Sequence, residues 1–241
     1  VVVIIGNSYS GEDIALELAG VSKEVHISAR SRKSEVTLTN PVDGPGNIFL
    51  HPVIESLCRD GTINFHDGAS IVADSIIHCT GYSYHFPFLD TKGIVTVNDN
   101  RVGPLYEHVF PPLLAPSLSF VGLPWMTVPF VLCELQSKWI ACILSGKTLL
   151  PSENDMMEAV KDFYARNEAF GRPNHYTHCL GTYQFGYLDW LSDQNGCAHV
   201  EAWRKEMSEE TVRNRVKRPH TYRDKWEDLY WLQMALSPES N

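Results

Sequence analysis

The first thirty residues alternate between apolar and polar stretches in a way typical of a strand, a helix and a second strand. Val1 to Ile5 is an unbroken run of β-branched residues, which predicts a strand that is buried on both faces. Glu12 to Ala19 places its apolar residues on one helical face, and Gly20 is positioned to end that helix. Glu24 to Ala29 alternates apolar with polar positions and predicts the second strand. A tight turn must therefore join the first strand to the helix.

The next stretch predicts a loop, a hairpin and a further strand. Residues 31–61 are rich in Gly, Pro, Asn and Asp, so we expect mostly loop there. Thr62 to His66 and Ala69 to Ala73 flank Asp67-Gly68, a pair that favours a β-hairpin with a type I′ turn. Ser75 to Cys79 then predicts another buried strand.

The second half of the chain predicts one strand followed by helices. Ser117 to Leu123 has the apolar pattern of a strand. Phe130 to Leu144 predicts an apolar helix that ends at Gly146. A further helix is predicted through Glu168, with Ser152 as its N-cap. The last seventy residues are aromatic and charged with weak periodicity, and we expect mixed short helices there.

Composition and charge limit the class of protein. The chain has 241 residues, of which 44% are hydrophobic, enough to bury one large core or two small ones. Its formal charge of -9 repels phosphate backbones, so we expect no nucleic-acid partner. Since no apolar run approaches the roughly 20 residues that span a bilayer, we expect no transmembrane segment. No signal peptide or carboxy-terminal anchor is visible, and the chain opens with Val1 inside a strand-like run. We expect part of a longer, cytoplasmic protein.

Cysteines and histidines offer candidate redox and metal chemistry, but their spacing supports neither. The chain has six cysteines, and no pair has the C-x-x-C spacing of a redox dithiol or a zinc ribbon. They predict reduced thiols of an intracellular protein. The ten histidines show no spacing such as H-E-x-x-H, so we assign no metal ligand.

The turn between the first strand and the helix has the pattern of a dinucleotide-binding loop. Gly6 permits a tight turn, and Gly11 allows the helix to pack closely against the strand. Ser8 replaces the middle glycine of G-x-G-x-x-G, leaves room for a pyrophosphate and adds a hydroxyl donor. The helix amino terminus adds unpaired N–H groups and a positive dipole end. The alternative is a tight turn with no ligand. The candidate phosphate-binding residues are Gly6, Asn7, Ser8, Tyr9, Ser10 and Gly11.

The end of the second strand indicates which nucleotide would bind. NAD-binding versions of this unit carry Asp or Glu there, which accepts a hydrogen bond from the ribose 2′-hydroxyl. Here the strand is followed by Arg30, with Arg32 and Lys33 close behind. A guanidinium can pair bidentately with a 2′-phosphate, so the sequence favours NADP(H) over NAD(H). The alternative is an ordinary solvated basic turn.

Several longer segments resemble flavin-containing monooxygenases. Asp74 to Tyr82 reads Asp-Ser-Ile-Ile-His-Cys-Thr-Gly-Tyr, and His85 to Leu89 follows it. The first run resembles the A-T-G-Y segment of that family, with Cys79 where the family commonly has Ala. The whole chain is most similar to the plant group of glucosinolate S-oxygenases. The same resemblance extends to Pro-Leu-Tyr-Glu-His-Val-Phe at 104–110, Phe-Val-Gly-Leu-Pro at 120–124, Glu-Leu-Gln-Ser-Lys-Trp-Ile-Ala at 134–141 and Tyr-Arg-Asp-Lys-Trp at 222–226.

The resemblance implies an α/β fold of the Rossmann-like flavoprotein type with two dinucleotide-binding domains, only part of which is present. Residues 1–75 would be part of the NADPH-binding domain, and residues 76–150 the returning half of the FAD-binding domain. Residues 151–241 would be a helical or irregular carboxy-terminal extension. The family's FAD glycine loop and its active-site asparagine would then precede Val1, and no catalytic residue can be assigned within this chain.

The resemblance also implies the chemistry. Such enzymes reduce FAD with NADPH and add O₂ to form a C4a-hydroperoxyflavin, from which a sulfide or amine substrate takes the distal oxygen. Thr80, Gly81, Tyr82 and Gln136 match family positions near the flavin. A glutamine within a helix is also a common buried polar or surface residue, and that alternative stays open for Gln136. We further expect the helix that begins near Phe130 to point its amino terminus at the pyrimidine end of the flavin.

Two other functions are compatible with the sequence. A truncated NADPH-binding fragment without catalysis would explain the missing FAD loop. A flavoprotein disulfide reductase shares the paired dinucleotide-binding design, but the lack of a C-x-x-C pair argues against it.

Overall fold

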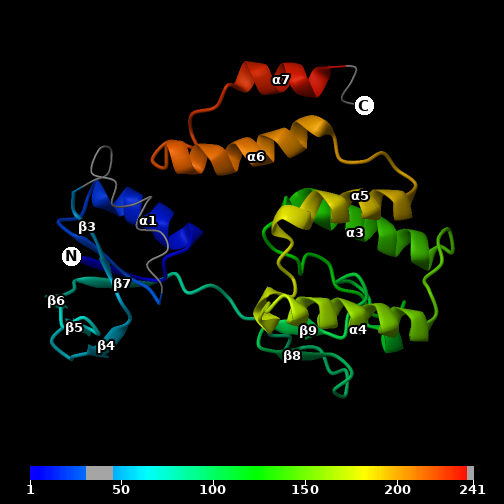
Figure 1. The fold of residues 1–241 in the computed structure, drawn as a ribbon, viewed down its shortest axis with the longest axis horizontal. Coiled ribbons are helices and arrows are strands. Elements are labelled where there is room, and N and C mark those ends of the chain that lie inside the picture. The colour runs from blue at the N-terminus through cyan, green and yellow to red at the C-terminus, as the bar shows by residue number, and fades with distance from the viewer. Residues whose placement is uncertain (31–45, 238–241) are drawn as a thin grey trace. The chain divides into compact units, whose positions relative to one another are not determined.

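The computed structural model of the chain describes residues 1–30 and 46–237 (Figure 1). Two compact units are present. Unit 1 consists of residues 1–82 and 209–227, and unit 2 consists of residues 83–208 and the chain from Asp228 onward. The functional domains expected from the sequence, with boundaries at residues 75 and 150, stay a prediction.

A parallel four-stranded sheet forms the centre of unit 1. Its strands are β1 (Val2–Ile5), β2 (Val25–Ser28), β3 (Ile48–His51) and β7 (Ser75–His78), in the order β3-β2-β1-β7. All neighbouring pairs run parallel. The β-branched residues that predicted β1 suit a strand covered on both faces, which is the usual position in a parallel sheet. The α/β fold class expected from the sequence is confirmed.

Different layers cover the two faces of this sheet. Helix α1 (Tyr9–Ala19) packs on one face, where Ile4 belongs to the same buried cluster as the alanines of α1. On the other face, Val3 packs with the antiparallel sheet of β4 (Ile54–Leu57), β5 (Thr62–Phe65) and β6 (Ser70–Val72). Val3 and Ile4 point to opposite faces because side chains alternate along a strand. Each fully buried side chain of this size contributes roughly 1.5–3 kcal/mol to stability.

Several predicted boundaries in unit 1 need correction. Residues 46–61 are not a loop, because they contain β3 and β4; residues 31–45 of the predicted loop lie outside the described residues. Helix α1 begins at Tyr9, three residues before the predicted start at Glu12. The β5–β6 hairpin is confirmed, but of Asp67-Gly68 only Gly68 has a positive φ, +85°. A type I′ turn needs positive φ at both central residues, so the turn is of another type.

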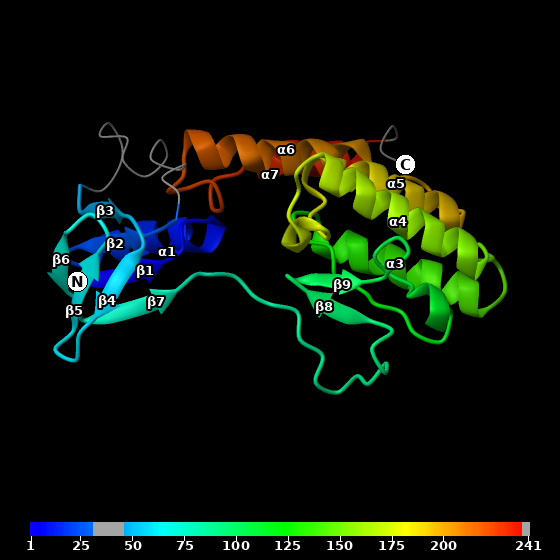
Figure 2. The same cartoon turned by 60° about the horizontal axis from the view of Figure 1, so that its bottom comes forward.

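Unit 2 is mostly helical, with one small hairpin (Figure 2). Helix α3 (Pro129–Leu144) packs along α5 (Gln184–Asn195), and their contact forms the main core around Trp139, Leu132 and Leu188. The predicted helix ends are confirmed at Gly146, which has φ +73°, and at Ser152, whose side chain accepts from the Asp155 amide at 3.2 Å. The elements are β8 (Thr96–Asn98), β9 (Arg101–Gly103), η1 (Pro112–Leu114), α3 (Pro129–Leu144), α4 (Glu153–Ala169), η2 (Asn174–Tyr176), η3 (Gly181–Tyr183), α5 (Gln184–Asn195) and α7 (Asp228–Leu236).

Two expectations for the second half were wrong. The run Ser117 to Leu123 is not a strand, although Phe120 and Leu123 are buried. Its apolar side chains pack into a local cluster, and Gly122 takes φ +78°, which no strand residue adopts. The last seventy residues contain helices, as expected, but α6 (Ala202–Lys217) is 16 residues long rather than short.

Candidate dinucleotide site

The glycine loop between β1 and α1 has no space for side chains at its two glycines. Gly6 has φ +112°, and a Cβ there would lie 2.3 Å from the Cys79 carbonyl oxygen. A Cβ at Gly11 would lie 2.1 Å from the Gly6 carbonyl oxygen. Both contacts are with backbone, which cannot rotate away as a side chain can. These contacts fix the tight turn and the close helix–strand packing that a dinucleotide-binding loop has at its first and last glycines.

The sheet brings most of the predicted residues together at the carboxyl ends of its strands. The chain moves from β1 to β2 and β3 on one side and returns to β7 on the other. The carboxyl ends of β1 and β7 are therefore neighbours at the point where the strand order reverses, the usual ligand crevice of open α/β sheets. The Gly6 amide donates to the Ser28 carbonyl at 2.9 Å, and the Cys79 amide donates to the Ile5 carbonyl at 2.8 Å.

The remaining predicted residues of unit 1 follow the same strand ends. Thr80, Gly81 and Tyr82 continue directly from the end of β7, next to the glycine loop. Arg30 lies two residues beyond the end of β2 and is exposed. Arg32 lies outside the described residues. The structure thus places the glycine loop, Arg30 and the Thr80 segment at one edge of the sheet.

The beginning of α1 offers hydrogen-bond donors at this edge. Ser8 is the N-cap residue in an extended conformation, and its side chain makes no capping hydrogen bond. The hydroxyl is thus available to a ligand. The Glu12 amide already donates to the Ser8 carbonyl at 2.9 Å, whereas the first amides of a helix have no partner within that helix. These donors and the helix dipole favour an anion beside Ser8.

A pocket of ≈ 280 Å³ lies beside the loop, and three of its seven lining residues come from a segment that sequence reasoning missed. The missed residues come from the carboxy-terminal segment of unit 1, more than 190 positions away in the chain. Only the clustering of basic residues at 213–218 could have drawn attention to this segment. The pocket is lined by Asn7, Ser8, Tyr9, Glu12, Val212, Arg215 and Val216.

Gln136 lies in unit 2, on α3, and its amide is already engaged. It is fully buried; its Oε1 accepts from the Gly122 amide at 2.9 Å, and its Nε2 donates to the Tyr187 hydroxyl at 3.0 Å. The Tyr187 hydroxyl in turn donates to the Glu107 carbonyl at 2.7 Å. Burial raises the pKa of Tyr187, so the phenol stays protonated and keeps donating. This geometry favours the alternative of a buried polar residue, and the flavin contact stays a prediction.

Replacing Gln136 with leucine should lower the free energy of unfolding by about 1–3 kcal/mol, because the Gly122 amide and the Tyr187 hydroxyl would lose the partner that the fully buried Gln136 amide provides. Urea unfolding of the full-length protein measures this effect. Gln233→Leu, at an exposed position of α7, should change stability by less than about 0.5 kcal/mol. Unchanged stability together with weaker flavin binding would instead assign Gln136 to the flavin alone.

A second polar cluster, in unit 2, consists of two buried histidines. His108 Nδ1 lies 3.0 Å from His178 Nδ1, and His178 Nε2 lies 3.1 Å from the Val102 amide. Glu107 and His108 have φ +46° and +62°, so this corner has a backbone conformation that such residues seldom adopt. Burial lowers the pKa of His108 to about 3 and that of His178 to about 4. The contacts of the two rings with each other and with Val102 support this corner. No group of three metal-ligating side chains occurs within residues 1–30 and 46–237.

The parallel sheet and its glycine loop define the chain as an α/β protein with a Rossmann-like fold. A protein-family model described as "Flavin-binding monooxygenase-like" matches residues 44–201. The chain belongs to this family, which confirms the resemblance seen in the sequence. Proteins of this family bind a flavin.

Similar proteins agree with this assignment. The chain is 54% identical over 235 residues to the flavin-containing monooxygenase FMO GS-OX5 of Arabidopsis thaliana, covering 98% of this chain and 51% of that protein. It is 52% identical to FMO GS-OX-like 3 of the same plant, with coverage of 98% and 52%. The chain therefore spans about half the length of these relatives.

Two solved structures share the fold. S-allyl-L-cysteine S-oxygenase from Allium sativum matches with a TM-score of 0.85 and 54% identity, over 97% of this chain and 53% of that one. Tmm from Pelagibacter sp. matches with a TM-score of 0.75 at 24% identity, which supports the fold alone. Among the described helices, none is both long and apolar enough to cross a membrane.

Proposed function

We propose that the protein containing this chain is an FAD- and NADPH-dependent monooxygenase that transfers one oxygen atom of O₂ to a sulfide sulfur or an amine nitrogen. The observation that carries the proposal is the glycine cradle at the switch point of the sheet, in a chain of the flavin-binding monooxygenase-like family. A relative with 54% identity is described as an S-oxygenase, which favours sulfur as the reacting atom.

Residues of unit 1 would hold NADPH. Gly6 and Gly11 fix the tight turn and the close packing of α1, and the Ser8 hydroxyl and the α1 amides would donate to the pyrophosphate. Arg30 would pair with the 2′-phosphate from the end of β2. Bound flavin would supply the activation of O₂. The flavin contacts proposed for Thr80, Gly81 and Tyr82 fit their place after β7, beside this cradle.

The cradle suits NADPH better than FAD. Within the described residues the structure shows one glycine loop of this kind, the loop after β1. Arg30 stands at the position where a carboxylate would select an unphosphorylated ribose. The phosphates of FAD would then need a second cradle that residues 1–30 and 46–237 do not provide.

Replacing Arg30 with alanine should weaken NADPH binding about 10- to 100-fold, because a charge-assisted hydrogen bond contributes roughly 1.5–3 kcal/mol. NADH binding should change little, since NADH has no 2′-phosphate. Isothermal titration of both nucleotides against the full-length protein makes the comparison. Arg59→Ala, another exposed arginine of unit 1, serves as the control. Equal losses for both nucleotides would assign Arg30 to structure.

The activity itself is tested with the full-length protein, a simple thioether, NADPH and O₂. The reaction should consume one NADPH, one proton and one O₂ for each sulfoxide and each water formed. Oxygen uptake and product analysis measure this ratio. Reduction of a disulfide without oxygen uptake would establish a disulfide reductase, and NADPH binding by a protein that holds no flavin would establish a non-catalytic module. Either result overturns the proposal.

A further inference from the structure

The carboxy-terminal segment of unit 1, residues 209–227, is bound to α1 by a network of charged groups. The Arg215 Nη2 donates to Glu12 Oε2 at 2.7 Å, and its Nη1 lies 3.4 Å from Asp13 Oδ1. The Tyr222 hydroxyl donates to Asp13 Oδ2 at 2.9 Å. One guanidinium thus serves two carboxylates of the first turns of α1.

This network lies beside the glycine loop. The guanidinium carbon of Arg215 lies 4.0 Å from the centroid of the Tyr9 ring, and Tyr9 is the first residue of α1. Arg215, Val212 and Val216 line the ≈ 280 Å³ pocket together with Ser8 and its neighbours. Val212 and Val216 remain 57% and 68% exposed, so the pocket offers apolar surface that a planar ring could cover.

The charges at this position are in conflict with phosphate binding unless they are compensated. Carboxylates are favourable near a helix amino terminus, but so is the phosphate that the loop would hold, and the two repel each other. The Glu12 and Arg215 side chains are only 14% and 12% exposed, so solvent screens their charges poorly. An unpaired Glu12 would therefore act strongly on an anion beside Ser8.

We propose that Arg215 is a positioning residue of the dinucleotide site, which compensates one of the two negative charges of Glu12 and Asp13 and holds residues 212–216 as a wall of the pocket. The proposal rests on the proposed binding of NADP(H) at the glycine loop. The positive charge at position 215 then sets the affinity for the dinucleotide, because it compensates the negative charge of Glu12. Its Nη groups already bond to the carboxylates, so Arg215 acts through them and not as a direct phosphate ligand.

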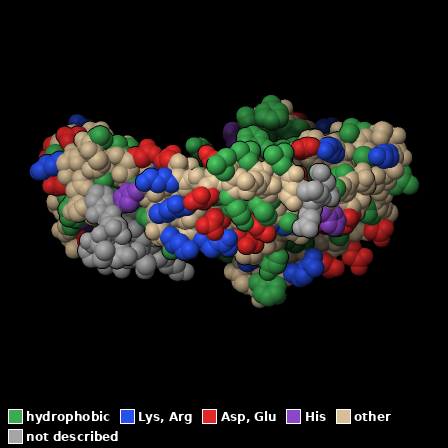
Figure 3. Space-filling model, turned by 90° about the horizontal axis from the view of Figure 1, so that it is seen from above, with side chains coloured by type: hydrophobic (Ala, Val, Ile, Leu, Met, Phe, Trp, Pro, Cys, Tyr) green, Lys and Arg blue, Asp and Glu red, His purple; other side chains and the backbone are tan. Residues whose placement is uncertain are grey.

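Basic side chains are plentiful on this face, which makes a matched control available. Figure 3 looks down on the face that carries α6 and shows Lys and Arg side chains intermixed with Asp and Glu. Arg223 pairs with Glu17 of the same helix α1. Both side chains of this pair are at least half exposed, and neither lines the pocket. Arg223 and Arg215 thus share a segment and a partner helix and differ in their distance along α1 from the loop.

The experiment measures NADP⁺ affinity by isothermal titration with the full-length protein. Arg215→Met should weaken binding about tenfold, because one buried carboxylate charge is left uncompensated near a phosphate. The double variant Arg215→Met/Glu12→Gln should recover most of that affinity, and Arg215→Lys should keep part of it. Arg223→Met should bind as the wild type does.

The salt dependence of NADP⁺ affinity separates electrostatic repulsion of the phosphate from a structural change of the pocket. The ratio of wild-type to Arg215→Met affinity should shrink between about 0.05 M and about 0.5 M NaCl, because added salt screens the extra repulsion. A purely structural defect would leave this ratio constant. Thermal unfolding of each variant shows whether it is folded. Should Arg215→Met fail to fold, Glu12→Gln in the wild-type background should still bind NADP⁺ at least as tightly as the wild type.

The results that contradict the inference are specific. Unchanged affinity in Arg215→Met, or a loss that Glu12→Gln does not rescue, would overturn the role of Arg215 while NADP⁺ binding by the wild type would leave the proposed function standing. Weaker binding by Glu12→Gln alone would also overturn it, since Glu12 would then contribute to binding. A wild-type protein that binds no NADP⁺ at all would overturn both.

Discussion

Replacing Gly11 with alanine should destabilise the full-length protein by about 3 kcal/mol or more and abolish measurable NADP⁺ binding. The added Cβ would lie 2.1 Å from the Gly6 carbonyl oxygen, well inside van der Waals contact. Overpacking of this kind costs about 1–3 kcal/mol, and more where backbone must move. Since relief requires α1 to shift away from β1, the amides that we propose to donate to the pyrophosphate would shift with it.

Urea unfolding and isothermal titration measure the two effects of Gly11→Ala. Gly186→Ala is the matched control, because Gly186 lies in α5 with nothing within 4 Å of an added Cβ. Alanine there should stabilise the protein by about 0.5–1 kcal/mol, as it usually does within a helix. Wild-type stability and NADP⁺ affinity in Gly11→Ala would show that the helix and the loop are not as tightly packed as the structure indicates.

Acidification should unfold unit 2, and the pKa values of the two buried histidines set the pH range over which stability is lost. Both have a pKa in the folded protein, about 3 for His108 and about 4 for His178, below the ordinary value of 6.5. The cause is burial, which disfavours the charged imidazolium. The unfolded chain therefore binds protons below about pH 6.5 that the folded chain does not. Stability is complete above that pH and falls as the pH drops towards about 4.

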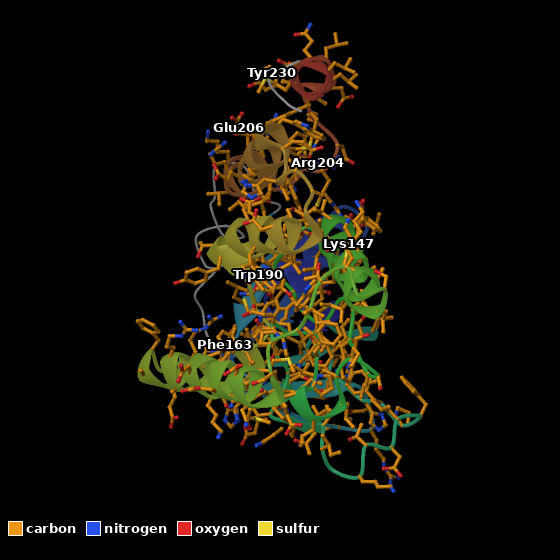
Figure 4. All side chains as sticks on the ribbon, turned by 90° about the vertical axis from the view of Figure 1, so that its right-hand side faces the viewer. Lys147, Phe163, Trp190, Arg204, Glu206 and Tyr230 are labelled. Atoms are coloured by element: carbon orange, nitrogen blue, oxygen red, sulfur yellow. The ribbon has the colours of Figure 1, made fainter. Side chains whose placement is uncertain are left out.

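The expected effect is large. Each histidine changes the folding equilibrium about tenfold per pH unit within that range. At about pH 5 the pair together should lower the stability by several kcal/mol. The rings are packed among aromatic side chains, including Phe163 of α4, which lies edge-on to His108 at 5.4 Å and is labelled in Figure 4. Little water can therefore reach a charged ring.

The measurement is the urea midpoint against pH for the wild type and for His108→Asn. Asparagine tolerates the φ of +62° at this position, and its short amide can still hydrogen-bond to His178. The variant should show a shallower decline of stability between about pH 6.5 and 4. His175→Asn, at an exposed histidine, is the control and should affect the decline far less. If stability declined with pH equally steeply in the wild type and in His108→Asn, protonation of His108 would not be a cause of the acid-induced loss of stability.

The parts of the fold that sequence reasoning located have strong local signals. The β1–loop–α1–β2 unit and α3 each combine an apolar period with a turn or stop residue within about twenty positions. β3 and β4 lack that periodicity and exist because β2 and β5 offer unpaired backbone beside them. The β8–β9 hairpin had a local signal that was missed, Asp99-Asn100, whose φ angles of +43° and +60° suit a type I′ turn.

The candidate site divides in the same way. The positions of Gly6 to Gly11 and of Arg30 could be predicted, because these residues come just after strands β1 and β2. Thr80 could be placed beside them only once β7 was known to pair with β1. Gln136 could be noted but not interpreted, because its partners Gly122 and Tyr187 come from different parts of the chain.

The sequence by itself determined the β1–loop–α1–β2 unit, helix α3 and the family of this protein. These depend on residues that are covalent neighbours, so no long loop has to close before their pattern has a meaning. Only the tertiary structure decided that Gly6 packs against the backbone of Cys79, that two histidines are buried against each other, and that Arg215 pairs with Glu12. Burial and charge compensation depend on which distant segments meet, and a single sequence does not show which of many basic residues reaches a given carboxylate.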